Sequence, residues 1–160
     1  MRVGCGYDSH RFAEGRTLML GGVCIPHDRG LEGWSDADAV THAVIDALCG
    51  AANLGDIGML FPAGDERFHE ACSLAFLDQV ADMLDKRHLA ISNVDVTIVA
   101  EEPVMAPHIP GMRASLASAM RLEPEQVSVK AKTNERMGFA GRGEGIAVFA
   151  VALVESGRGV

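Results

Sequence analysis

The stretch from Gly145 to Val154 constrains the fold more than any other part of the chain, because nearly all of its side chains are apolar. A strand of this kind has apolar side chains on both sides and needs cover on both faces. A chain of 160 residues is small for a sheet that is buried on both sides by its own helices. We therefore expect one cover to come from the chain itself and the other from a second subunit.

The length and the apolar content, 160 residues and 48% hydrophobic, suit a single domain over residues 1–160. No apolar run reaches the ~18 residues that a transmembrane helix needs, so no membrane span is predicted. The four cysteines form no C-x-x-C pair, and the segment from Met1 to Gly4 carries no apolar signal region. These features predict a reduced, cytoplasmic protein.

The net charge of −8 argues against a nucleic-acid partner, because the chain has no basic stripe to neutralise phosphates. An anionic small molecule can still bind where local positive charge overcomes the overall field. Metal ions, helix N-termini and single basic residues provide such charge.

Hydrophobic periodicity predicts a mixture of strands and helices. Strands are expected at 2–7, 91–100, 127–131 and 145–154. An extended piece at 17–25 bends at Gly21-Gly22 and forms a hairpin-like opening with the first strand. Helices are expected from about 70 to 87 and within 110–120, and the Gly, Pro and Asp residues between 53 and 65 predict an irregular loop.

The clearest helix follows Ser35, a good N-cap residue with Asp38 three positions later, as in a capping box. Asp38, His42 and Asp46 are spaced by four and share one side of this helix. A solvated polar face is the simplest interpretation of that row. The apolar residues on the other side form one stripe that must face the core, namely Val40, Ala43, Val44, Ala47, Leu48 and Ala51.

Asp8 and His10, just past the first extended stretch, form a candidate metal-binding pair. Residues two apart on a strand point to the same side. Carboxylate oxygens and imidazole nitrogens are both acceptable ligands for Zn²⁺ and similar divalent ions. Two ligands do not complete a site, and His42 is the candidate for the third.

The segment from Lys130 to Gly145 combines four glycines with cations, one hydroxyl and acids. Glycines let backbone amides approach a phosphate, Lys and Thr can donate to its oxygens, and Glu can hold Mg²⁺. Taken alone, the segment is more safely interpreted as a glycine-rich connection between strands.

Several motifs follow one another along the chain in a recognisable order. The array closely resembles the 2-C-methyl-D-erythritol 2,4-cyclodiphosphate synthase family of the non-mevalonate route to isoprenoid precursors, and the likeness covers nearly the whole chain. The motifs are Asp8-Ser9-His10, Ser35-Asp36-Ala37-Asp38 with His42, Gly55-Asp56-Ile57-Gly58 with Phe61-Pro62, Asn93-Val94-Asp95-Val96-Thr97, Pro107-His108-Ile109-Pro110, and Lys132-Thr133-Asn134-Glu135 continuing to Gly141-Arg142-Gly143-Glu144-Gly145.

The resemblance implies an α/β fold of the α+β type, with one domain and a mostly four-stranded mixed sheet covered by helices on one face. It also implies a homotrimer, in which the sheets face inward around the axis and the active sites lie between neighbouring subunits. Family members can hold an isoprenoid diphosphate in a central apolar cavity, near the positions of Phe139 and Arg142. For Phe139, ordinary core packing is the alternative.

The resemblance further implies that Asp8, His10 and His42 bind Zn²⁺ and leave an open coordination position for a substrate phosphate. Glu135 is implied to help hold a second ion, Mg²⁺ or Mn²⁺. That ion lies between the two phosphates of the substrate's cytidine diphosphate unit.

In the family reaction, the 2-phosphate of 4-diphosphocytidyl-2-C-methyl-D-erythritol 2-phosphate attacks the β-phosphorus, closes a ring and expels CMP. This chemistry depends mainly on positioning and charge stabilisation, and the resemblance assigns those roles to Thr133 and Lys132. The implied erythritol-binding residues are Asp56, Gly58, Phe61 and Asp65, and Ser35 and Ile57 are also implied to bind the substrate. The implied cytidine-binding residues are Ala100, Pro103, Met105, Ala106, Ala131, Lys132 and Thr133.

Trp34 is the main departure from the family pattern, because it stands where the family usually has a histidine that stabilises the transferring phosphate. An indole is a neutral donor through one N–H, whereas histidine can carry positive charge near neutral pH. We therefore expect metal and substrate binding with altered catalysis, either slower or supported by another group. Cys5 also replaces a frequent histidine, and we expect it to be a small buried thiol.

Two other classes of function fit the same residues. A metal-dependent phosphoesterase would direct the ligands at water and release a ring-opened product. A non-catalytic trimeric protein that binds isoprenoid diphosphates would result if Trp34 abolished catalysis.

Overall fold

The computed structural model describes residues 1–156 and contains a five-stranded sheet with β7 at its centre. The order is β4-β1-β7-β5-β6, and neighbouring strands are antiparallel except for the parallel pair β5 and β6. The mixed sheet of four main strands is confirmed, and a short β4 extends it at one edge. The expected domain ends at residue 160, so its last four residues lie outside the described part. The strands are β1 (Arg2–Glu14), β4 (Arg29–Leu31), β5 (Leu89–Val99), β6 (Val127–Lys132) and β7 (Gly145–Ser156).

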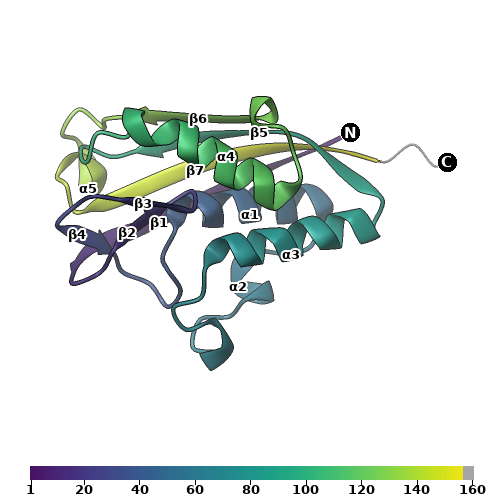
Figure 1. The fold of residues 1–160 in the computed structure, drawn as a ribbon, viewed down its shortest axis with the longest axis horizontal. Helices are drawn as coiled ribbons and strands as arrows, with labels where there is room; N and C mark the ends of the chain where they lie inside the picture. The colour runs from purple at the N-terminus through teal and green to yellow at the C-terminus, as the bar shows by residue number, and fades with distance from the viewer. Residues whose placement is uncertain (157–160) are drawn as a thin grey trace.

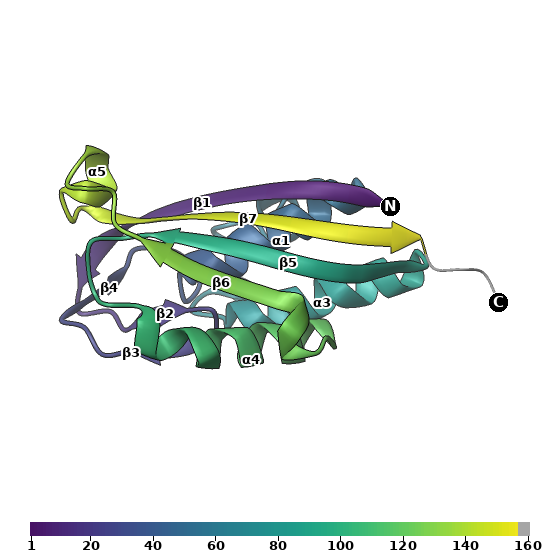
Figure 2. The ribbon, with the colours of Figure 1, turned by 90° about the horizontal axis from the view of Figure 1, so that it is seen from above.

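Three long helices cover one face of this sheet, as Figures 1 and 2 show from two directions. They are α1 (Ala39–Ala52), α3 (Ser73–Lys86) and α4 (Ile109–Met120), in agreement with the predicted helical segments. The whole predicted apolar stripe of α1 is buried. On α3, Phe76 is buried together with Leu77 and Val80.

The predicted loop between residues 53 and 65 contains a short helix, α2 (Ile57–Leu60), which the sequence interpretation missed. The Asp56 side chain caps it by accepting the backbone N–H of Met59 at 2.8 Å. The extended piece at 17–25 bends as expected but forms its own two-stranded sheet, so its predicted pairing with the first strand is wrong. The remaining elements are β2 (Leu18–Leu20), β3 (Val23–Ile25), η1 (Glu66–Phe68), η2 (Ala106–His108), η3 (Pro124–Gln126) and α5 (Gly138–Gly141).

Helix α1 lies directly against the backbone of β1. A Cβ atom added to Gly4 would stand 1.8 Å from the carbonyl oxygen of Ala47, and one added to Gly6 would stand 2.0 Å from that of Ala43. Real side chains do not tolerate such distances, so both positions depend on glycine. The close approach places the first turns of α1 over the middle of β1.

The start of α1 differs from the prediction. Asp38, not Ser35, is the N-cap, and its carboxylate accepts the Thr41 N–H at 2.9 Å. The backbone of Ala37 has φ of 55°, which interrupts helical geometry before Asp38. The same carboxylate accepts the backbone N–H groups of Gly21 and Gly22, each at 2.7 Å. Asp38 is therefore fully buried rather than solvated.

The two faces of the sheet differ in their cover. Ile146, Val148 and Ala150 of β7 are completely buried against the helices. On the other face, Phe149 is 48% and Val151 43% exposed, and the Tyr7 ring lies 5.0 Å from that of Phe149. We call this second surface the open face; it also carries Val3 and Cys5, so the expectation of a buried Cys5 is wrong for the single chain. Among residues 1–156, no helix has the length and apolar character needed to cross a bilayer.

Candidate metal centre and substrate pocket

Asp8, His10 and His42 converge at the junction of β1 and α1. Oδ2 of Asp8 lies 2.9 Å from Nε2 of His10 and 3.0 Å from Nδ1 of His42. One potential ligand atom from each residue lies within 4.8 Å of the others. The predicted common side of Asp8 and His10 is confirmed, and His42 joins them. The solvated-face interpretation of His42 is wrong, because the residue is only 7% exposed.

The second nitrogen of each imidazole has its own hydrogen-bond partner. Nδ1 of His10 lies 2.5 Å from the carbonyl oxygen of Glu32, and Nε2 of His42 lies 2.8 Å from Oγ of Ser73. Metal-binding histidines usually donate their other N–H in this way, which orients the ring and selects its tautomer. The nitrogen, nitrogen and oxygen donor set, with its supporting contacts, fits a divalent ion such as Zn²⁺. These residues form a group that can hold a metal ion.

The three side chains are also coupled through their charges. Burial raises the pKa of Asp8, but hydrogen bonds from His10 and His42 outweigh that effect and leave the pKa of Asp8 well below its ordinary value. Burial lowers the pKa of His10, and the hydrogen bond and charge of Asp8 outweigh it, so the net shift of the His10 pKa is upward. Asp8 is therefore an anion throughout the physiological range, as a metal ligand must be.

A pocket of about 220 Å³ opens beside the metal-binding group. The rings of Phe61 and Phe76 stack in its wall at 4.3 Å, and Phe68 meets Phe76 edge-on at 5.4 Å. The predicted residues that line it are Asp8, His10, Trp34, Ser35, His42, Ile57, Gly58 and Phe61, and the structure adds Ala63, Phe68 and Phe76. The three implied zinc ligands and four of the implied substrate-binding residues, Ser35, Ile57, Gly58 and Phe61, thus lie around one cavity.

Asp56 and Asp65 were also predicted to bind substrate, and neither is among the residues that line this pocket. Asp56 caps α2, as described above. Asp65 forms an ion pair with Arg67 at 2.6 Å, and hydrogen bonding to Arg67 lowers the pKa of Asp65 to about 2. Both carboxylates lie on the loop that frames the pocket.

Trp34 stands in the pocket wall, but its one N–H is already used. Nε1 donates to the carbonyl oxygen of Asp65 at 2.9 Å, and the Trp34 carbonyl accepts the N–H of Glu70 at 2.9 Å. The ring of His69 meets the indole edge-on at 4.8 Å. Trp34 therefore holds the loop 65–70 and presents an apolar ring surface to the cavity.

A second group of predicted residues lies where the parallel strands β5 and β6 end. The N–H of Ala100 donates to the carbonyl oxygen of Lys132 at 3.0 Å, which places the segment after β5 beside Ala131 and Thr133. Oε1 of Glu101 accepts the N–H groups of Asn134 and Arg136 at 2.9 and 3.2 Å. The segment that contains Pro103, Met105 and Ala106 is thus joined to the turn that carries Thr133.

Thr133 and Glu135 are exposed and bind each other, with Oγ1 of Thr133 donating to Oε1 of Glu135 at 2.7 Å. Glu135 has φ of 50°, in the left-handed region. Neither residue, nor Lys132, is among those that line the pocket of the metal-binding group. One chain therefore does not bring the two sets of predicted residues into a single cavity.

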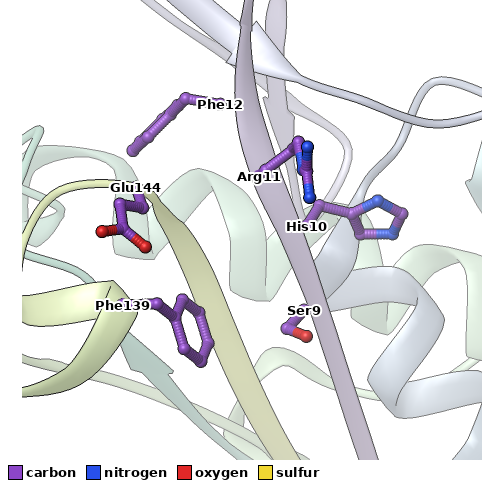
Figure 3. A pocket seen from close by; sticks show the side chains of 6 residues that line it. All are labelled: Ser9, His10, Arg11, Phe12, Phe139 and Glu144. Carbon is purple, nitrogen blue, oxygen red and sulfur yellow. The ribbon is translucent and has the colours of Figure 1, made fainter.

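Phe139 lines a third region, a cavity of about 580 Å³ whose lining side chains Figure 3 shows along β1 and on the segment that leads from α5 into β7. Ser9, His10, Arg11, Phe12 and Glu144 complete its lining. Phe139 is 38% exposed, so it is not packed in the core of the single chain. The neighbouring Arg142 is exposed and paired with Glu144 at 2.6 Å.

Sequence reasoning missed the groups that support the metal-binding residues. The carbonyl of Glu32 acts through the backbone, so no side-chain pattern reports it. Ser73 is the first residue of α3, and an isolated serine at a helix start gives only a capping signal. Phe68 and Phe76 could have been identified as a cluster of aromatic residues close to Phe61 in the sequence.

The fold and the site together define a metal-binding α/β protein with a small-molecule pocket. The sequence pattern of the YgbB family matches residues 1–155, and the chain belongs to that family.

Individual relatives agree along nearly their full length. A 2-C-methyl-D-erythritol 2,4-cyclodiphosphate synthase of Syntrophus aciditrophicus is 52% identical over 158 residues, which cover 99% of both chains. The synthase of the same name from Dehalococcoides mccartyi is 55% identical, covering 97% of this chain and 99% of its own. A solved CDP complex of IspF from Plasmodium falciparum superposes with a TM-score of 0.86 at 31% identity, covering 98% of this chain and 97% of the other.

Proposed function

We propose that this chain converts 4-diphosphocytidyl-2-C-methyl-D-erythritol 2-phosphate to 2-C-methyl-D-erythritol 2,4-cyclodiphosphate and releases CMP. In this step an oxygen of the 2-phosphate forms a bond to the β-phosphorus, and the bond from that phosphorus to the oxygen bridging to CMP breaks. CMP leaves with the electron pair of that bond. The observation that carries the proposal is the convergence of Asp8, His10 and His42 beside a pocket in a chain of this family.

The residues present suit two metal ions with different roles. Asp8, His10 and His42 would hold Zn²⁺, and Glu135 would contribute to a Mg²⁺ or Mn²⁺ site at the substrate diphosphate. When bound, the ions supply positive charge that polarises the phosphoryl oxygens and orients the phosphates. The protein contributes the alignment of the two reacting phosphates and the exclusion of bulk water.

The side chains of this chain position the substrate around its reacting centre. The stacked phenylalanine rings and the Ile57-Gly58 backbone would enclose the methylerythritol unit. The hydroxyl of Thr133 can turn from Glu135 to a phosphoryl oxygen once Glu135 binds a cation. Lys132 would offset the charge of the diphosphate, and the segments at 100–106 and 131–133 would hold cytidine.

We further propose a homotrimer with the open face directed at the axis. Apolar side chains on a sheet face need cover, and Val3, Tyr7, Phe149 and Val151 provide the surface for a second and a third copy. Such an assembly lets the pocket of one subunit meet the Thr133 turn of its neighbour, which the single chain does not achieve. Phe139 and Arg142 would then lie near the axis, where an isoprenoid diphosphate could bind.

A charge on the open face tests this assembly. Val151→Lys should convert a trimer into smaller species in sedimentation measurements, because a lysine cannot be desolvated there without a partner. Met59→Lys is the matched control, since Met59 is 72% exposed but lies on α2. A native chain that sediments as a monomer would refute the trimer.

The four unpaired cysteines, Cys5, Cys24, Cys49 and Cys72, are consistent with a reducing compartment, and we propose that the protein works in the cytoplasm.

The reaction itself is tested with the cytidine-linked substrate in the presence of Zn²⁺ and Mg²⁺. Equal amounts of CMP and cyclic diphosphate are expected from the native chain. CMP with a ring-opened product would identify a phosphoesterase instead. Complete absence of CMP, with an isoprenoid diphosphate still bound, would identify a non-catalytic binding protein.

A further inference from the structure

Nε2 of His42, the ring nitrogen that faces away from Asp8, begins a chain of hydrogen bonds that passes through the buried Ser73 and ends on Asp36. Nε2 of His42 lies 2.8 Å from Oγ of Ser73, and that hydroxyl donates to Oδ1 of Asp36. Ser73 is completely buried. The chain therefore connects α1, the first residue of α3 and the segment that precedes α1.

The direction of these hydrogen bonds follows from the groups involved. Oδ1 of Asp36 accepts the one proton of the Ser73 hydroxyl. The Ser73 oxygen is then an acceptor toward His42, which must carry its proton on Nε2. Nδ1 of His42, which lies 3.0 Å from Oδ2 of Asp8, can then offer its lone pair to a metal ion in place of a hydrogen bond to Asp8.

Asp36 is held in place independently of His42. Its Oδ2 accepts the backbone N–H of Ser73 at 2.9 Å, and its Oδ1 accepts the N–H of Asp38 at 3.2 Å. Asp36 therefore also caps α3, where the N-cap residue Cys72 makes no side-chain hydrogen bond.

Ser35 is the other hydroxyl near Nε2 of His42, but its geometry is weaker. Its Oγ lies 3.3 Å from Nε2 and also accepts the N–H of Ala37 at 3.4 Å. Hydrogen bonds at these distances are at the long end of the usual range. Ser73 is thus the principal partner of His42.

We propose that Ser73 and Asp36 are positioning residues that fix the tautomer and the ring orientation of His42 for metal binding. Ser73 acts by contact with His42, and Asp36 acts through Ser73. The inference rests on the proposed metal site and adds the two residues that determine its affinity from outside the ligand set. Loss of such outer contacts typically weakens metal binding by about 10- to 100-fold.

The test measures zinc affinity by competition with a chelator in the full-length protein. Ser73→Ala removes the hydroxyl but keeps the backbone N–H that Asp36 caps, and it should weaken zinc binding by about 10- to 100-fold. Ser73→Thr retains a hydroxyl and should restore most of the affinity. Unchanged zinc affinity in Ser73→Ala would overturn the inference.

Thr41→Val is the matched control for loss of a buried hydroxyl. Oγ1 of Thr41 donates to Asp38 at 2.7 Å, and Thr41 is as buried as Ser73 and adjacent to His42 in sequence. This variant should lose thermal stability and retain native zinc affinity. An equal loss of zinc affinity in Thr41→Val would show that Ser73 acts only through stability, and would also overturn the inference.

A double-mutant cycle tests whether Asp36 acts through Ser73. Asp36→Asn should weaken zinc binding in the native background and change it by less than about twofold in the Ser73→Ala background. Additive losses would refute the connection. If the native chain itself binds no zinc, the proposed metal function fails, which is distinct from a native chain that binds zinc with no contribution from Ser73.

Discussion

The metal-binding corner and the Thr133 turn are both parts of the proposed active site, yet they are built in opposite ways. Asp8, His10 and His42 project from a central strand and a buried helix, and each imidazole is held at both nitrogens. Thr133 and Glu135 lie on an exposed turn and satisfy each other's polar groups. The corner is therefore preorganised in one chain, whereas the turn has functional groups that a ligand or a neighbour must redirect.

This difference suits the two tasks. A metal ion binds tightly when its ligands need little rearrangement, so a rigid support is favourable. A substrate that enters and leaves has to be gripped reversibly, and groups on a loop can exchange internal partners for external ones. Each prediction below tests whether the division between a fixed half and an adjustable half is correct.

The largest effect is expected from the fixed half. Asp8→Asn removes the anion that both histidines contact, so zinc should be lost and turnover should fall by about 10³-fold, which corresponds to roughly 4 kcal/mol of lost transition-state stabilisation. Metal content and rate of CMP release measure the two results. Asp82→Asn, on the surface of α3, is the control, and an Asp8 variant that keeps zinc and full activity would contradict the assignment.

In the adjustable half, a substitution should lower activity without changing metal binding. Thr133→Ala should lower kcat by about 10²- to 10³-fold, as expected for loss of one donor to a phosphoryl oxygen. Its zinc affinity should equal that of the native chain, because Thr133 does not contact the metal-binding group. Thr133→Ser should recover most of the rate, and a loss of zinc in Thr133→Ala would show that the two halves are not independent.

Cysteine reactivity should report the rigidity of α1, which carries both His42 and Cys49. Burial raises the pKa of the Cys49 thiol to about 11 from a reference of 9.0, so its thiolate population near pH 8 should be about 10²-fold smaller than that of an unperturbed thiol. Alkylation at pH 8 followed by mass spectrometry should therefore label the exposed Cys24 well before the buried Cys49. Comparable labelling rates would show that the helix opens readily.

The smallest effect is expected at Trp34. Trp34→His should alter kcat by at most about tenfold, upward if the imidazole reaches the phosphate, because it replaces one neutral donor by a group that can be cationic. The variant also loses the indole bond to Asp65, so KM should rise as the loop 65–70 loosens. A histidine variant no faster than the native chain would show that catalysis does not depend on a cation at this position.

The main elements of the fold could be predicted from periodicity because their side chains follow one environment. Val94, Val96 and Ile98 alternate with half-buried neighbours on β5, and the stripe of α1 is buried as expected. The sequence interpretation was wrong where polar side chains are buried and form hydrogen bonds in the interior. Asp38 looked like a surface residue because its partners, the N–H groups of Gly21 and Gly22, belong to a distant turn.

The candidate site was predictable to the extent that the motifs carry side-chain chemistry. Asp8 and His10 could be named as a candidate pair from their spacing on a strand, and the family resemblance then implied His42 as the third ligand. Ser73 and the Glu32 carbonyl could not be named, because their roles exist only after distant segments pack together. The separation of the Thr133 turn from the pocket also follows from tertiary structure alone.

Gly4 and Gly6 influence the geometry of the metal-binding group without contacting it. Because they allow Ala43 and Ala47 to pack against the strand backbone, they set the distance between α1 and β1. The distance between α1 and β1 in turn determines the distance between the His42 ring and Asp8. A methyl group at either glycine would lift the helix and spread ligands that the substitution never touches. Selection for metal affinity would then act on two positions without a side chain, which a search for reactive groups would pass over.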